Sequence, residues 1–232
     1  MNKNNDTKRR ILEKAEILFA EKGFNGVTVR DVTAAAKCNT GAVNYHFQSK
    51  KNLYMEVFRS RWIPREFKMY EHLKETLEKI QSPSPAMVIK AVAQAYLEGP
   101  LSDEELRRHR QLIIREINNP TEVFEMVADQ TLRPLFAYLQ ERLSPYLPSH
   151  LDEESLTLDI MSIFGVLLYF TYSRPMISRV IGRRYDPEFK ARLISQVVRF
   201  SLEGLEVNGK GEKGCQRRYS QTAPTQDLFL ST

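Results

Sequence analysis

Apolar residues recur at helical spacing along nearly the whole chain, and this pattern limits the possible folds more than any other feature. Ile11, Ala15, Leu18 and Phe19, for example, share one face of a helix. No segment shows the alternation of apolar and polar residues that is typical of a half-buried strand. The sequence therefore predicts an all-α fold without internal repeats.

Capping residues and prolines divide the helical pattern into segments. Asp6 or Thr7 can begin the first helix, Gly23 fits its end, and Pro64 should kink or split the fourth helix because proline lacks an N–H. We expect further helices at about residues 29–36, 40–45, from 50 onward, 85–98, 103–118, 121–143, 153–173 and 187–205. Their predicted N-caps include Thr28, Asn39, Ser49, Ser102, Asn119, Asp152 and Asp186.

The length of 232 residues allows one or two domains, and a chain of this size buries enough surface to fold without disulfides or metals. Two cysteines, Cys38 and Cys215, fit a reducing cytoplasm. The first ten residues precede no apolar run, so we expect no secretory signal. The longest apolar stretch, from Ile160 to Tyr172, has 13 residues and is too short to span a bilayer.

Positive charge is concentrated in the first sixty residues. They contain 11 Lys and Arg against 6 Asp and Glu, whereas residues 61–207 contain 19 against 21. A small basic unit joined to a near-neutral body suggests an anionic polymer as partner, and a solvated charged face is the alternative interpretation.

Residues 28–53 contain two short predicted helices separated by a tight turn around Lys37, Cys38 and Asn39. Small or β-branched residues such as Val32 and Val43 suit two helices that cross closely. This arrangement is a helix-turn-helix, whose second helix enters the major groove of DNA. The residues predicted to contact base edges or phosphates, or to allow close approach of the backbone, are Thr40, Gly41, Ala42, Asn44, Tyr45, His46 and Lys50.

The segment resembles the DNA-binding domain of TetR-family transcriptional regulators. The resemblance spans about residues 8–55 and is carried by Ala15, Phe19, Gly23, Phe24, Thr28, Val32, Gly41, Tyr45, Phe47, Lys50 and Leu53. It implies phosphate contacts at Thr28 and Tyr45, whereas Arg30 either contacts phosphate or is solvated, and Phe47 belongs to the core. It also implies a homodimer on a palindromic double-stranded DNA operator and release by a small molecule. The sequence departs from the family at Lys37, where glycine is common and a positive φ strains other residues.

These observations divide the chain into three parts. We predict a helix-turn-helix DNA-binding domain over residues 1–55, a helical regulatory and dimerisation domain over 56–207, and a disordered tail over 208–232. A glycine pattern from Gly209 to Gly214 formally matches a dinucleotide fingerprint, but it lacks the flanking strand and helix of that motif. We interpret it as a linker.

The helix predicted over 153–173 is apolar on more than one face, and an apolar face left exposed in a monomer marks an interface. With the last helix it is expected to form a two-fold dimer interface, unless it is wholly buried in one subunit. The residues assigned to this interface are Leu156, Ile160, Ile163, Phe164, Leu167, Val197 and Phe200. A ligand pocket in the middle helices is assigned to Arg110, Phe124, Met126, Phe136, Tyr169 and Tyr172.

The sequence contains no common enzyme motif, and its four histidines are scattered. We therefore expect no enzyme, no cofactor, no metal and no membrane partner. The sequence predicts a cytoplasmic, dimeric transcriptional repressor that a small-molecule effector releases from its operator. An activator, a regulator controlled by a protein partner, and an all-helical enzyme are the alternatives.

Overall fold

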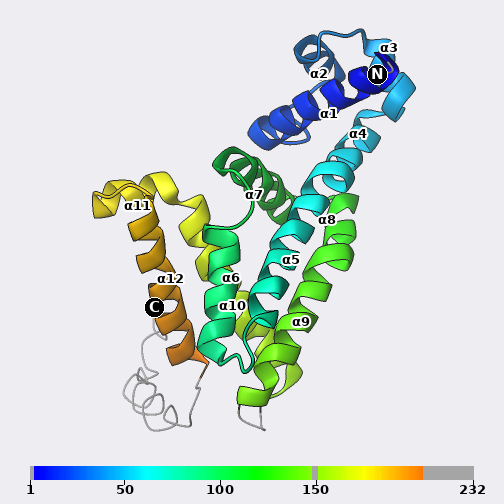
Figure 1. The fold of residues 1–232 in the computed structure, drawn as a ribbon. Helices are drawn as coiled ribbons and strands as arrows, with labels where there is room; N and C mark the ends of the chain where they lie inside the picture. Colours follow the sequence, from blue (N-terminus) through cyan, green and yellow to red (C-terminus); the bar gives the residue numbers. More distant parts are fainter. Residues whose placement is uncertain (1–2, 148–150, 206–232) are drawn as a thin grey trace, which may run out of the picture.

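The computed structural model describes residues 3–147 and 151–205, and every regular element within these ranges is helical. The predicted all-α fold is therefore confirmed. Figure 1 shows a small helical head at one end of a longer helical body. The predicted tail over 208–232, with Cys215 and the glycine pattern, lies outside the described residues.

The head consists of α1 (Lys3–Lys22), α2 (Val29–Ala35) and α3 (Thr40–Phe47), and α4 (Lys50–Val57) leads from it into the body (Figure 1). Because α1 already begins at Lys3, the predicted cap at Asp6 or Thr7 is wrong, and the Asp6 carboxylate pairs with Arg9 instead. Gly23 follows α1 with a φ of 75°, which glycine adopts without strain.

Side-chain caps begin most of the helices where the sequence predicts them. The side chains of Thr28, Asn39, Ser49, Ser102, Asp152 and Asp186 each accept a hydrogen bond from the backbone N–H three residues later. The predicted cap at Asn119 is wrong, because Asn119 ends the preceding helix and Thr121 caps the next one. Pro120 explains this shift, since a residue before proline is driven out of the helical conformation.

Two long helices of the body each contain a π-helical turn. One turn, Phe58–Trp62, joins α4 to α5 (Ile63–Glu78), and the other, Ala128–Leu132, joins α8 (Glu122–Val127) to α9 (Arg133–Leu143). Each turn precedes a proline in the first turn of the next segment, Pro64 or Pro134. Proline has no N–H and its ring clashes with the carbonyl four residues back, so a wider turn relieves the clash. The helix is therefore widened at Pro64 and not split.

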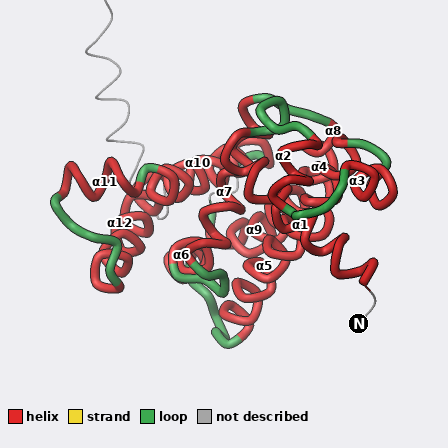
Figure 2. Tube along the Cα trace, turned by 90° about the horizontal axis from the view of Figure 1, so that it is seen from above, coloured by secondary structure: helices red, strands yellow, loops and turns green. Residues whose placement is uncertain are grey.

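The body is completed by α6 (Pro85–Leu97), α7 (Asp103–Asn118), a 3-10 turn at Ser144–Tyr146, α10 (Glu153–Tyr172), α11 (Arg174–Ile181) and α12 (Pro187–Gly204). Figure 2 shows α11 and α12 on the side of the body opposite the head. Helix α11 is not among the helices predicted from the sequence. Its signals are Pro175 in the first turn and Gly182, which has a φ of 72° at its end.

Two apolar cores hold these elements together. One core lies among α5, α6, α9, α10 and α12, and the other fills the head and continues along α4 to Trp62. The head core also contains Leu112 and Val123, which come from α7 and α8 of the body. The predicted division at residue 55 thus falls within continuous packing, in which α7 and α8 of the body contact the head directly.

Within the described ranges, α10 is the one helix long and apolar enough to cross a membrane by length and composition. Core helices of soluble proteins meet the same criterion, and six residues of α10 are buried inside this chain. The length and composition of α10 are therefore only weak evidence that it spans a membrane.

Candidate DNA interface and internal cavity

The turn between α2 and α3 has the geometry of a helix-turn-helix. Val32 of α2 and Val43 of α3 are fully buried against each other's helices in the head core. Lys37 carries the chain through the turn with a φ of 51°, in the left-handed region where the family's glycine is unstrained. The Asn39 side chain then accepts the Ala42 N–H at 2.9 Å and starts α3.

One face of α3 is open to solvent. Thr40, Gly41, Asn44 and Tyr45 are exposed, and the Tyr45 side chain is 74% exposed. Phe47, predicted as a core residue, is buried, whereas Ala42 and His46, predicted as DNA contacts, are half-buried. The exposed face therefore presents one hydroxyl, one amide and one phenol beside a glycine, which suits base edges and phosphates.

Thr28 and Arg30 flank this face from the start of α2, and both are exposed. The Thr28 hydroxyl donates to Asp31 Oδ2 at 2.7 Å, and its oxygen accepts the Asp31 N–H at 3.1 Å. The Thr28 hydroxyl and the Thr28 backbone N–H, which donates to Oδ2 at 2.8 Å, together lower the pKa of the Asp31 carboxyl. Thr28 is therefore fixed in place, whereas Arg30 extends from the surface.

Lys50, a predicted phosphate contact, holds the loop between α1 and α2. Its ammonium donates to the backbone oxygens of Phe24 and Val27, both at 3.0 Å, and lies 4.2 Å from the centre of the Phe24 ring. Two of its three N–H groups are thus used to hold the loop between α1 and α2. Lys50 therefore stabilises the head, and its phosphate contact stays a prediction.

A cavity of about 360 Å³ that is partly open to solvent lies in the body, among α5, α6, α7, α10 and the α8–α9 pair. Four of the predicted pocket residues line it: Arg110, Phe124, Phe136 and Tyr172. Two do not. Met126 packs against the head core, and Tyr169 is half exposed on the outer side of α10, because each points to the opposite side of its helix.

The cavity wall contains a buried polar cluster that the pocket prediction missed. The Glu66 carboxylate accepts a hydrogen bond from the Tyr96 hydroxyl and lies 2.9 Å from His109 Nε2. The Trp62 ring stacks on the His109 ring at 4.4 Å, and its indole N–H donates to the His109 carbonyl at 2.8 Å. Trp62, at the end of the π-helical turn, and Glu66 and Met69 of α5 follow one another by about one helical turn, and this spacing is the sequence signal for the wall.

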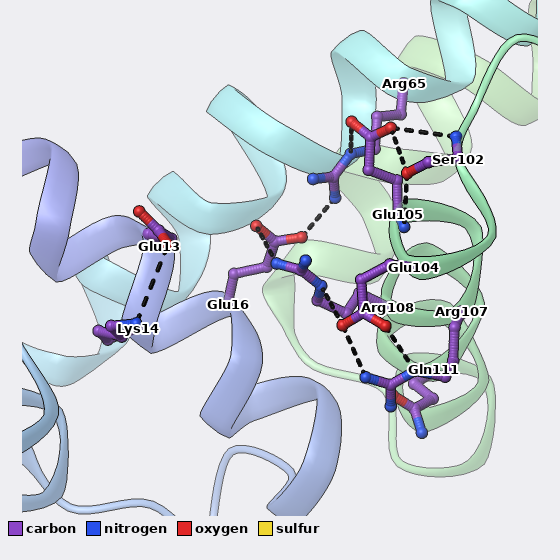
Figure 3. A network of polar contacts seen from close by, with 10 residues as sticks. All are labelled: Glu13, Lys14, Glu16, Arg65, Ser102, Glu104, Glu105, Arg107, Arg108 and Gln111. Atoms are coloured by element: carbon purple, nitrogen blue, oxygen red, sulfur yellow. Dashed lines mark hydrogen bonds and ion pairs between the residues drawn. The ribbon is translucent and has the colours of Figure 1, made fainter.

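A buried ion-pair network connects this wall to the head. Glu16 of α1 is fully buried, and its carboxylate pairs with Arg65 of α5 and, at 3.9 Å, with Arg108 of α7 (Figure 3). Arg65 precedes Glu66 in the chain, and Arg108 precedes His109. The residues that hold α1 are therefore direct neighbours of the residues that line the cavity.

Two further contacts attach the head to α7. The Arg115 guanidinium donates to the carbonyls of Ala20 and Glu21 at the end of α1, at 3.0 and 2.5 Å. The Tyr54 hydroxyl donates to Glu116 at 2.6 Å, and burial raises the pKa of Tyr54. Helix α7 thus contacts the cavity on one side and the head on the other.

Comparison with known proteins gives two matches that together cover most of the chain. Residues 11–57 match the family described as bacterial regulatory proteins, tetR family. Residues 85–205, more than half of the chain, match the C-terminal domain of the HTH-type transcriptional dual regulator CecR. The chain belongs to the TetR family of transcriptional regulators.

Relatives along most of the chain agree with this membership. The regulator is 25% identical over 202 residues to the HTH-type transcriptional dual regulator CecR of Shigella flexneri, covering 84% of this chain and 89% of CecR. It is 24% identical to the biofilm operon negative regulator IcaR of Staphylococcus aureus strain Newman, over 75% and 87% of the two chains. A TetR-family regulator from Bordetella parapertussis has the same fold, with a TM-score of 0.61, 17% identity and coverage of 84% and 93%.

The TetR-family regulator is thus a DNA-binding protein of a family whose members bind operators, act as dimers and are typically cytoplasmic. The family consists of transcriptional regulators, which are not generally enzymes.

The regulator buries most of the residues that the sequence assigned to its dimer interface. Six of them lie in the core of their own chain: Leu156, Ile160, Ile163, Phe164, Leu167 and Val197. This assignment is corrected, because their face of α10 and α12 packs against α6 and α9. Phe200 alone of the set is exposed, at 56%, and shares a shallow apolar hollow with Tyr169 and Val166 on the outer side of both helices.

Proposed function

We propose that this regulator represses transcription as a cytoplasmic homodimer on a palindromic operator and leaves the DNA when a small molecule enters the cavity. The observation that carries the proposal is the shared use of α5 and α7. Both helices line the cavity, and both hold the buried Glu16 of the head. A ligand that moves either helix changes the placement of α3 relative to the partner subunit's recognition helix.

The exposed face of α3 supports the assignment of DNA contacts. We assign Asn44 and Thr40 to base edges, Tyr45, Thr28 and Arg30 to phosphates, and Gly41 to close approach of the backbone. Ala42 and His46 support α3 from their half-buried positions. In a dimer the two recognition helices must lie about 34–36 Å apart to enter successive major grooves.

The outer faces of α10 and α12 support the dimer. Leu158 and Tyr169 on α10 and Phe200 on α12 are each at least half exposed. The position of Gly165 between them is open, since a Cβ built there meets no atom within 4 Å. Large apolar side chains around an open position suit self-complementary packing across a two-fold axis.

A second role as activator at some promoters is favoured by one observation. The relative CecR is described as a dual regulator. In vitro transcription from the operator found below separates the two roles, because repression lowers the transcript and activation raises it.

The test begins with selection of duplexes from a random pool by the purified protein, followed by fluorescence anisotropy at several salt concentrations. Asn44→Ala should lose about 1–3 kcal/mol of preference for the selected site. Arg30→Gln should weaken selected and random duplexes alike and make the salt slope shallower by about 0.9. Arg133→Gln, which changes an exposed arginine of α9 in the body, is the matched control and should alter neither. Failure to enrich any sequence would refute the proposal.

A further inference from the structure

One end of the cavity contains a positive charge, and no carboxylate of the described residues contacts it. Arg110 is buried, and its guanidinium donates to the carbonyls of Tyr96 at 2.9 Å and Thr171 at 3.2 Å. A guanidinium has five N–H donors. Among the described residues, no ion pair includes Arg110, and the nearby carboxylate of Asp103, which favours the charge of Arg110, pairs with Arg174 instead. Within this part of the chain, the Arg110 guanidinium therefore has no carboxylate in direct contact.

A second guanidinium increases the positive charge beside Arg110. Arg174 pairs with the exposed Asp103 at 3.2 Å, but its Nε and Nη2 are buried without a hydrogen-bond partner among the described residues. Burial, and then repulsion by Arg174, lower the pKa of Arg110 to about 9. Arg110 is thus still charged at neutral pH, in surroundings that disfavour the charge.

The remaining polar groups of the cavity leave capacity for a ligand at this end. The buried Tyr172 hydroxyl has no hydrogen-bond partner within the described ranges. The Glu66 carboxylate does not neutralise Arg110, because its two oxygens face the Tyr96 hydroxyl and His109 Nε2. The other walls are largely apolar and include Phe124, Phe136 and Phe164.

We propose that the effector of this regulator is an organic anion with an apolar, ring-containing body. Its carboxylate or sulfonate head binds Arg110 and the Tyr172 hydroxyl, and its body fills the apolar part of the cavity. This inference rests on the proposed role of the cavity as the effector site. The volume of about 360 Å³ is at the small end of the roughly 300–1,000 Å³ common for such sites.

A purely structural role of Arg110 is the competing explanation. Tyr96 and Thr171 each lie next to the last residue of their helices, α6 and α10. Carbonyls at helix ends carry partial negative charge, and one arginine between two such ends stabilises both. In that case the charge of a ligand would not affect its binding.

A matched pair of probes separates the two explanations. 1-Anilinonaphthalene-8-sulfonate and N-phenyl-1-naphthylamine share the same rings, and only the first carries a sulfonate. Trp62 is the single tryptophan of the chain and lies in the cavity wall, so quenching of its emission reports binding there. We expect the sulfonate to bind the full-length dimer at least about tenfold more tightly than the neutral probe.

Variants assign this preference to Arg110. Arg110→Gln should abolish the preference for the anion, and Arg110→Lys should retain part of it. Tyr172→Phe should reduce it severalfold. Arg107→Gln is the matched control, because Arg107 lies on the same helix, faces solvent and pairs with Glu104. It should leave the preference unchanged.

Two results would overturn the inference: equal affinity of wild-type protein for both probes, or a preference that survives in Arg110→Gln. If circular dichroism shows that Arg110→Gln does not fold, the affinities of wild type and of Tyr172→Phe for the two probes still test the inference. Absence of Trp62 quenching by either probe would instead contradict the cavity as an effector site. Binding of both probes with equal affinity would leave that site intact and reject only the anionic head.

Discussion

Replacing the buried Glu16 by glutamine should destabilise the protein more than any surface change. The carboxylate is fully buried, and Arg65 and Arg108 have side-chain exposures of only 9% and 17%. Removing one partner of a buried pair typically costs about 3–5 kcal/mol, because a charge is left unpaired. In the variant, Arg65 still lies 3.7 Å from Glu105 and Arg108 still lies 3.2 Å from Glu104. We therefore expect a loss of stability at the lower end of this range, about 3 kcal/mol.

The assay is urea unfolding of wild type and Glu16→Gln at equal protein concentration, followed by circular dichroism and by Trp62 emission. With a slope of about 3 kcal/mol per M, the midpoint should fall by about 1 M. Equal concentration matters because the stability of a dimer depends on mass action.

A double variant tests whether the loss comes from the unpaired charge. Glu16→Leu combined with Arg65→Met replaces the pair by apolar groups of similar size and should recover most of the stability. The reasoning is refuted if Glu16→Gln loses less than about 1 kcal/mol, or if the double variant loses as much as the two single variants together. Effector titrations of the folded variants should also show weaker coupling to DNA.

Three further predictions use other contacts. Lys50→Met should lower the melting temperature, because two carbonyls of the loop after α1 lose their donor, while the salt slope of DNA binding stays unchanged; a slope shallower by about 0.9 would restore Lys50 as a phosphate contact. Phe200→Glu should yield folded monomers by sedimentation, whereas Leu167→Glu, at a fully buried position, should unfold the body; a folded dimeric Phe200→Glu would contradict the proposed interface. Burial raises the pKa of Tyr54, so the free energy of unfolding should fall as the pH rises above about 10, and Tyr54→Phe should reduce that fall; an equal fall in both proteins contradicts the assignment.

Local signals predicted the head well because they are short-range. A cap such as Asn39 needs only the backbone N–H three residues later. The strain of the turn at Lys37 comes from the positive φ of that one residue. Helix α11 was not predicted, although Pro175 and Gly182 bracket it and its apolar residues share one face, because it has only eight residues. Short helices depend on packing that a sequence does not display.

The wrong assignments in the body concern which way a helix face points in the tertiary structure. Both faces of α10 are apolar, and periodicity alone does not tell which face meets its own core, so Leu167 was assigned to the interface and Tyr169 to the pocket. Four of the six residues predicted for the pocket nevertheless line the cavity, since large aromatic residues on middle helices often line cavities. Glu66 was not predicted, because a buried carboxylate depends on partners far away in the chain.

The π turn before Pro64 fixes the rotation of α4 relative to α5 about their common helix axis. Each residue of an α-helix advances the chain by about 100°, so the extra residue held in Phe58–Trp62 offsets everything before it by roughly that angle. Deleting one residue there would turn the head about that axis and aim α3 away from the groove, while leaving every capping contact of the head intact. The widened turn therefore sets the direction in which the recognition helix α3 points.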